Sequence, residues 1–143
     1  MIDQKSTPSL PVLGYSDTST VKLDFDDVSF RIVKYWSFRA TKWFKLGRFM
    51  ILKSSKNHYH VIFDRPVSWK KNIHVMAWVA LESRNAKLTD YLIMQCIKEA
   101  STLRVSNKGE KPSPRVVFSY RVPEAEILRF LQLRRLIKQT SNF

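Results

Sequence analysis

The sequence predicts an α+β domain in which an antiparallel sheet is backed by helices. Three observations lead to this prediction. The 143-residue chain is 44% hydrophobic and 13% aromatic, which is enough for one core of ordinary size. Segments with the alternating apolar pattern of strands take turns with segments of helical periodicity, and no internal repeat is visible. Neighbouring strand-like segments are joined by short polar turns, which favours antiparallel hairpins.

Residues 1–20 combine Ser, Thr, Pro, Gly and Asp without apolar periodicity, which predicts a flexible N-terminal tail. Residues 21–143 are then expected to form a single domain. Its first element is a strand at 21–26, with the sequence VKLDFD. Because side chains alternate along a strand, Asp24 and Asp26 are expected side by side on one face.

The next segment, 28–44, has apolar residues at helical spacing and a basic outer stripe, so we expect an amphipathic helix. One interpretation of the preceding aspartates is that Asp26 or Asp27 is simply the N-cap of this helix. Residues 48–53 and 58–63 follow as two strands, which form a hairpin around a polar turn.

Two further helices are expected at about 69–82 and 90–100, with Ser68 and Thr89 as their N-caps. The single cysteine, Cys96, lies in the apolar stretch YLIMQCI of the second of these helices. This position predicts a buried thiol without a functional role.

Strands at 102–106 and 115–120 flank a second polar turn, and Pro123 opens a final helix at 124–138. The complete order contains a βαββαβ core of the RNA-recognition-motif kind, followed by a C-terminal helix. Such a fold does not by itself assign a function.

The charge of the chain indicates which partners it meets. Its 25 lysines and arginines exceed its 12 acidic residues, for a net charge of +13. Residues 1–27 hold five aspartates and two lysines, a net charge of −3, so the remainder carries +16. This charge predicts DNA, RNA or nucleotide partners. Since there is neither an apolar run of about 18 residues nor a signal pattern, we expect no membrane partner and a cytoplasmic location.

Two carboxylates and two imidazoles are the candidate functional side chains. Asp24 and Asp26 bring two negative charges together, which is unfavourable unless a cation lies between them. Mg²⁺ or Mn²⁺ binds such carboxylates together with substrate phosphates. His58 and His60 also share a strand face, and they are either an alternative metal pair or polar residues without a ligand.

The segment from Ser54 to His60, SSKNHYH, resembles the second motif of the archaeo-eukaryotic primase superfamily, S-G-x-x-G-Y-H, which precedes an apolar strand. Upstream, VKLDFDD resembles the first motif of that family, a D-x-D on a strand before a helix. The resemblance implies a catalytic role for Asp24, Asp26 and His60, with a metal ion on the two aspartates. It also implies nucleotide or phosphate binding by Ser54, His60, Arg104 and Lys108. Ser55 and Lys56 are further candidates for phosphate binding, because they offer a hydroxyl and an ammonium at a tight turn.

The chain departs from the family pattern in two places. Ser55 and His58 replace the glycines of the second motif, and the third, acidic motif has no clear counterpart. Since two-metal catalysis usually uses three acids, an accessory role is favoured over independent catalysis. The chain is similar in outline to the small non-catalytic primase subunits. This similarity implies DNA template and NTPs as ligands, catalytic and large primase subunits as partners, and no iron–sulfur cluster.

In an accessory role, lysines and arginines would hold the phosphates of the template. The candidates lie on the first helix, on the strand at 115–120 and on the last helix. They are Arg31, Lys34, Lys42, Arg115, Arg134 and Arg135.

Two other classes of protein remain open. HYHVIF also resembles the H-x-H strand of rolling-circle initiator nucleases, in which His58 and His60 would bind the metal and Tyr91 would attack DNA phosphate. The third class is a non-catalytic basic DNA- or RNA-binding module, in which the aspartates and histidines are structural.

Overall fold

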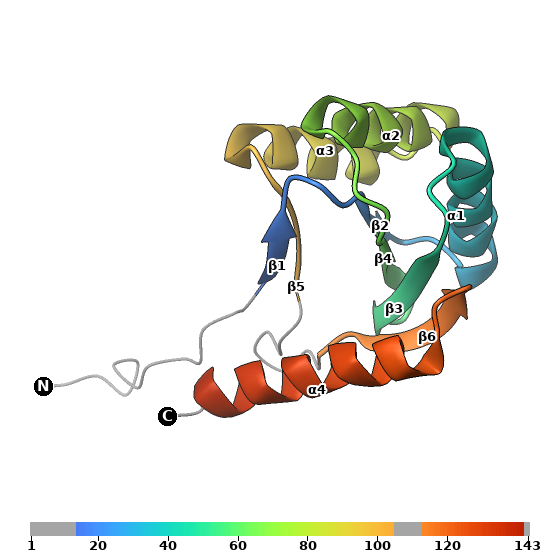
Figure 1. Cartoon of the computed structure of the whole chain (residues 1–143). Helices are drawn as coiled ribbons and strands as arrows, with labels where there is room; N and C mark the ends of the chain where they lie inside the picture. Colours follow the sequence, from blue (N-terminus) through green and yellow to red (C-terminus); the bar gives the residue numbers. More distant parts are fainter. Residues whose placement is uncertain (1–13, 105–112, 142–143) are drawn as a thin grey trace, which may run out of the picture.

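The computed structural model describes residues 14–104 and 113–141, with the side chains of the last helix described as far as residue 132. Within these described ranges, ten elements follow one another (Figure 1). They are β1 (Gly14–Asp17), β2 (Lys22–Asp26), α1 (Phe30–Phe44), β3 (Phe49–Ser55), β4 (His58–Phe63), α2 (Trp69–Glu82), α3 (Ala86–Lys98), β5 (Ser101–Arg104), β6 (Arg115–Tyr120) and α4 (Glu124–Ser141).

The predicted α+β class is confirmed. Four strands form an antiparallel sheet in the order β2-β4-β3-β6, and β1 and β5 pair antiparallel in a separate ribbon. The strand order of an RNA-recognition motif is not confirmed. The last strand of the expected core, β5, is hydrogen-bonded to β1 rather than to β2, and β6 adds a strand beside β3.

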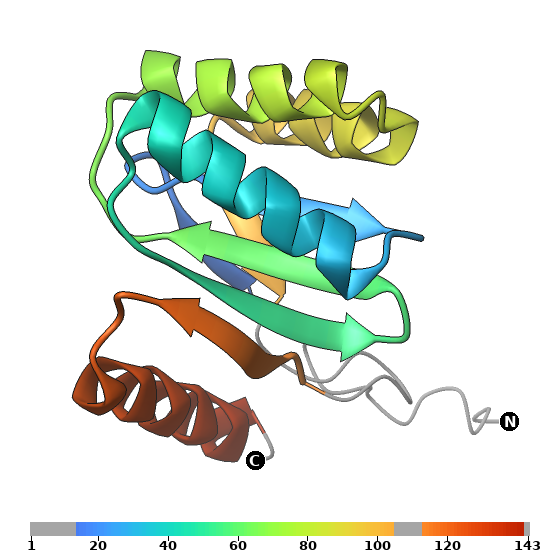
Figure 2. The same ribbon diagram turned by 90° about the vertical axis from the view of Figure 1, so that its right-hand side faces the viewer.

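Helices α1, α2 and α3 cover one face of the four-stranded sheet, which we call the first face (Figure 2). Leu23 and Phe25 of β2 and Val61 of β4 are fully buried there against Val33 of α1 and Val75 of α2. The opposite or second face has a smaller apolar cluster of buried residues, Leu52, Ile62 and Leu103, against which Phe130 of α4 packs. The strands therefore separate an apolar first face from a second face of mixed polarity.

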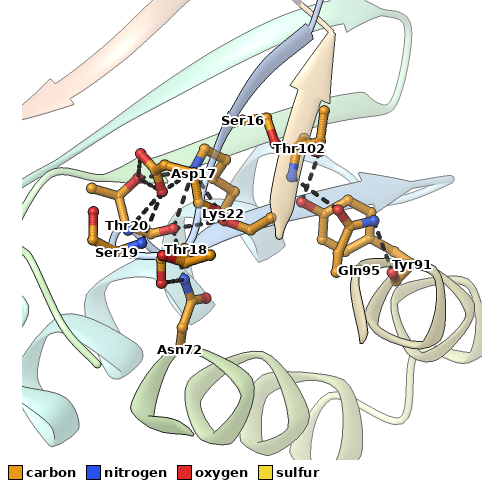
Figure 3. Close-up of polar contacts among 11 residues, drawn as sticks. Ser16, Asp17, Thr18, Ser19, Thr20, Lys22, Asn72, Tyr91, Gln95 and Thr102 are labelled. Atoms are coloured by element: carbon orange, nitrogen blue, oxygen red, sulfur yellow. Dashed lines mark hydrogen bonds and ion pairs between the residues drawn. The ribbon is translucent and has the colours of Figure 1, made fainter. Parts of the chain in front are cut away.

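Part of the expected 1–20 tail has regular structure, because Gly14–Asp17 form β1. A buried lysine explains how this segment is held. Lys22 is fully buried, and its Nζ donates to Asp17 Oδ1 (2.9 Å), Thr20 Oγ1 (2.8 Å) and Ser101 Oγ (3.0 Å). Figure 3 shows Lys22 reaching toward Asp17 and Thr20. We call these four residues the lysine cluster.

The lysine cluster shifts the pKa values of its charged members. Burial lowers the pKa of Lys22, and the hydrogen bond and charge of Asp17 act in the opposite direction. Burial also raises the pKa of Asp17, but hydrogen bonds from Lys22 and Thr20 outweigh it and hold this pKa at about 2. The Asp17 carboxylate is therefore ionised at neutral pH, and Nζ of Lys22 lies 2.9 Å from it as its ion-pair partner within the fold.

Two helix starts differ from the sequence prediction. Ser29 is the N-cap of α1 and its side chain accepts the N–H three residues further on, so neither Asp26 nor Asp27 caps this helix. Asn85, and not Thr89, is the N-cap of α3. In both cases a neighbouring side chain of the same capping type has the required extended backbone.

The prediction that Cys96 is buried is wrong, because the thiol is exposed on α3. Helix α3 turns Leu88 and Gln95 inward, and the next position along the helix from Gln95 faces solvent. Ile93 and Ile97 are exposed on the same helix. An apolar stretch of sequence thus forms an amphipathic helix whose outer side keeps several apolar groups.

Candidate functional site

Strands β2 and β4 bring the two sequence motifs together. Their antiparallel pairing sets Asp24 opposite His60 and Asp26 opposite His58. Leu23 and Phe25 of β2 face the helices. Because side chains alternate along a strand, Asp24 and Asp26 lie on the second face of the sheet. We call these four side chains the carboxylate–imidazole quartet. The predicted proximity of the acidic strand and the histidine hairpin is therefore present.

Within the quartet, each carboxylate faces an imidazole. Nδ1 of His58 is 2.7 Å from Oδ1 of Asp26, and Nε2 of His60 is 3.4 Å from Oδ1 of Asp24. The Asp24 and Asp26 side chains are 30% and 39% exposed, so solvent or a ligand reaches both. The geometry explains how two acids are tolerated side by side, since each has a nitrogen partner on the next strand.

Two further residues extend the quartet at its outer end. Asp27 Oδ1 lies 3.9 Å from Nε2 of His58, and Oδ2 of Asp27 accepts a hydrogen bond from Nζ of Lys87. This ion pair lowers the pKa of Asp27 and raises that of Lys87. Sequence reasoning missed the pair, because its partners are 60 residues apart and no local pattern links them.

His60 is the most buried member of the quartet, with a side chain only 8% exposed. Burial and, to a smaller extent, the nearby charge of Arg104 lower its pKa to about 4, although the charge of Asp26 raises it. The ring is therefore neutral at pH 7. It serves as a polar contact rather than as a cation.

Arg104 lies near the quartet, on β5. Its charge acts on His60, and the charge of Asp24 acts on Arg104. Burial lowers the pKa of Arg104, while Asp24 raises it. A cation from a third strand thus lies near Asp24 and His60, so that β2, β4 and β5 all contribute to the site.

The serines of the hairpin have different surroundings. Ser54 is the extra residue where the pairing of β3 with β4 shifts register, and its buried hydroxyl donates to the carbonyl of His58 (3.3 Å). Ser55 pairs with His58 and is half-buried, whereas Lys56 is exposed at the turn. Of the predicted phosphate contacts in the hairpin, the Lys56 ammonium is thus presented to solvent and the Ser54 hydroxyl is used within the turn.

The predicted nucleic-acid contacts do not gather at the quartet. Arg31, Lys34 and Lys42 lie on α1, which covers the first face of the sheet. Nζ of Lys34 lies over the ring of Phe118 on β6, 4.6 Å from its centroid. Arg115 is exposed at the start of β6. The structure therefore places these cations along α1 and β6.

Three predicted contacts are not placed. Lys108 lies outside the described residues. Arg134 and Arg135 belong to the part of α4 whose side chains are not described.

The Mg²⁺ or Mn²⁺ ion predicted on Asp24 and Asp26 needs ligands that converge. Within residues 14–104 and 113–132, no group of three His, Cys, Asp or Glu side chains is placed to hold a metal ion. Asp24 and Asp26 each face an imidazole nitrogen instead. The side chains present do not assemble a metal site from protein ligands alone, and metal binding stays a prediction.

Tyr91, the nucleophile of the nuclease alternative, is held inside the fold. Its hydroxyl donates to the carbonyl of Thr102 (3.0 Å), and Figure 3 shows the two side by side. Burial raises the pKa of Tyr91 well above its usual range, and so does the charge of Asp24. To form a phosphate ester with DNA, the Tyr91 hydroxyl would have to break its hydrogen bond and lose its proton. The geometry therefore favours a structural role for Tyr91.

We expect Tyr91→Phe to lower the free energy of unfolding by about 1 kcal/mol, the usual net contribution of one neutral hydrogen bond. Affinity for single-stranded DNA should not change. Urea denaturation and fluorescence anisotropy measure the two quantities, with the exposed Tyr35→Phe as control. A covalent adduct of single-stranded DNA on wild-type protein, absent from Tyr91→Phe, would show that the hydroxyl is a nucleophile.

Comparison with known proteins gives no match: no family model fits the sequence, and no curated protein and no solved structure matches it significantly. Across the part of the chain that the structure describes, no helix is both long and apolar enough to cross a membrane. The class established by the structure is thus an α+β domain whose sheet carries paired carboxylates and imidazoles.

Proposed function

We propose that this chain is a nucleic-acid- and nucleotide-binding protein of DNA replication, which assists primer synthesis as a primase-like accessory domain. The main support is the pairing of β2 with β4, which joins the D-x-D strand and the serine–histidine hairpin on one sheet face. These segments follow one another as the corresponding motifs of the primase superfamily do. The net charge of +13 also supports a polyanionic partner.

In this proposal, phosphate groups bind beside the quartet through Arg104. A guanidinium offers five N–H donors in a planar fork that matches phosphate oxygens. Arg104 is close enough to interact electrostatically with His60 and with Asp24. A phosphate held by this arginine would therefore lie beside the quartet. Lys56, exposed at the hairpin turn, supplies a second cation. The proposed role is binding, and no chemical step is assigned to a metal ion.

We expect Arg104→Ala to weaken binding of ATP and of single-stranded DNA about tenfold, because a charge-assisted hydrogen bond to phosphate is lost. Calorimetry with and without EDTA measures ATP binding, and fluorescence anisotropy measures DNA binding. The control is Arg129→Ala, which removes the same charge from an exposed position on α4 and should leave both affinities nearly unchanged. Equal losses in the two variants would reduce the site to a diffuse positive surface.

The accessory role is tested by primer synthesis on a single-stranded template with NTPs. The wild-type chain should make no primers alone. Added to catalytic and large primase subunits, it should raise the yield of primers that they make, whereas Arg104→Ala should not raise that yield. Suppose instead that the chain alone made primers and that Asp24→Asn with Asp26→Asn abolished them. The chain would then be catalytic, and the accessory form of the proposal would be wrong.

A further inference from the structure

A basic pocket lies where the end of α1 meets the end of β6, near the junctions that follow both elements. Its volume is about 400 Å³. Four cationic side chains line it, and no carboxylate does: the four are Lys42, Lys45, Arg65 and Arg121. The quartet is toward the other end of the sheet. Tyr120 lines the pocket and pairs with Phe49 at the start of β3, whereas His58 of the quartet pairs with Ser55 at the end of β3.

The backbone fixes the cations around the pocket. Lys45 is the C-cap of helix α1 and has the left-handed φ of 54°, and Gly47 follows with φ of 81°. Arg65, from the segment after β4, donates to the carbonyl of Lys45. Arg121 follows β6 with a φ of 60°, and its guanidinium lies over the ring of Tyr120, 5.0 Å from the centroid. Three separate segments thus converge on one hollow.

Stabilisation of the helix end does not account for so much positive charge. The C-terminus of a helix carries about half a negative elementary charge, which one nearby cation satisfies. Two nearby acids are already used, because Arg48 pairs with Asp64 and with Glu126. None of the four pocket cations forms an ion pair with a carboxylate among the described residues. An excess of roughly three positive charges remains for a ligand.

The walls of the pocket add an apolar surface. Phe38 of α1 and Tyr120 of β6 meet edge to face, with centroids 4.9 Å apart and planes at 72°. Both rings line the pocket beside the cations. Aromatic rings next to cations are what a nucleotide requires, since the base or sugar contacts the ring and the phosphates meet the charges. The volume is also in the range of small-molecule sites.

We propose that this pocket binds the phosphate groups of a nucleotide, either a free nucleoside triphosphate or the terminal phosphate of a nucleic-acid strand. It is a site separate from the quartet, and it does not depend on the function proposed there. Lys42 and Arg121 are the phosphate contacts from α1 and from the end of β6. Arg65 also has a structural role, because it donates a hydrogen bond to the carbonyl of Lys45 at the end of α1.

The test uses a double variant, Lys42→Ala with Arg121→Ala, which removes two exposed cations from the pocket and leaves Arg65 in place. The matched control is Lys70→Ala with Lys98→Ala, which removes two exposed cations from other helices. The probes are inorganic triphosphate, ATP, and oligothymidylate with or without a 5′ phosphate, measured by calorimetry. Circular dichroism and thermal melting establish that both variants fold.

We expect the pocket variant to bind inorganic triphosphate at least about tenfold more weakly, with little change in the control. A 5′-phosphate preference that disappears only in the pocket variant assigns the site to the end of a strand. A fall in the number of ATP molecules bound per chain in the pocket variant, without any 5′-phosphate preference, assigns it to free nucleotide. Equal weakening in both variants, or no binding of any probe by the wild type, would overturn the proposal.

Discussion

Protonation of His60 alone is expected to lower the free energy of unfolding by about 3 kcal/mol as the pH falls from 6.5 to 4. The pKa of this imidazole is about 4 in the folded chain, against an ordinary value of 6.5. The folded state therefore binds the proton more weakly than the unfolded chain does. The contribution is fully present above pH 6.5 and is lost as the pH falls through this window.

Urea denaturation between pH 7 and pH 4 measures this loss in wild-type protein and in His60→Gln, which hydrogen-bonds but does not titrate. Other groups also titrate in this range, so the evidence is the difference between the two pH slopes. The control is His74→Gln, which replaces an exposed histidine. This variant should show the same slope of unfolding free energy against pH as the wild type. Parallel slopes for wild type and His60→Gln would show that His60 is not held neutral by burial.

The second large effect is expected from Lys22→Met, which should lower the free energy of unfolding by about 3 kcal/mol. Methionine fills a similar volume without the charge. Its introduction leaves the Asp17 carboxylate without its cation and the Ser101 hydroxyl without its contact to Nζ. The figure is at the low end for a broken buried ion pair, because the Asp17 side chain is 26% exposed.

Chemical denaturation of Lys22→Met, of Asp17→Asn and of the double variant isolates the coupling of the two charges. The double variant should lose less than the sum of the single losses, since each single variant leaves one charge without its partner. Additive losses would show that Lys22 contributes packing only. Because the pKa of Asp17 is held at about 2, below its ordinary 3.8, the wild type should also lose stability as the pH falls from about 4 to 2.

Local patterns predicted the elements that form the quartet. The alternation in VKLDFD and in the histidine hairpin indicated two strands, and both are present as β2 and β4. The shared face of Asp24 and Asp26 follows from the period of two along a strand. That His60 lies opposite Asp24 is a matter of register between strands, and only the resemblance to the primase motifs indicated that the two segments meet.

Features that depend on distant segments were not predictable from the chain. Lys22 alternates with apolar residues and has the pattern of an exposed polar position, yet Ser101, 79 residues later, helps to bury it. The pocket cations Lys45, Arg65 and Arg121 come from three segments with no common motif. Composition gave the sign of the charge, but the packing of α1 against the sheet decides where that charge collects.

The pairing of β1 with β5 has a consequence for folding during synthesis. The first described strand of the chain finds its hydrogen-bonding partner only after Arg104 has left the ribosome. The hairpin of β3 and β4, by contrast, joins neighbouring segments and can form while translation continues. Strand β1 therefore stays without its partner strand while the segments between the two are made, and the ribbon closes after the hairpin of β3 and β4 has had time to form.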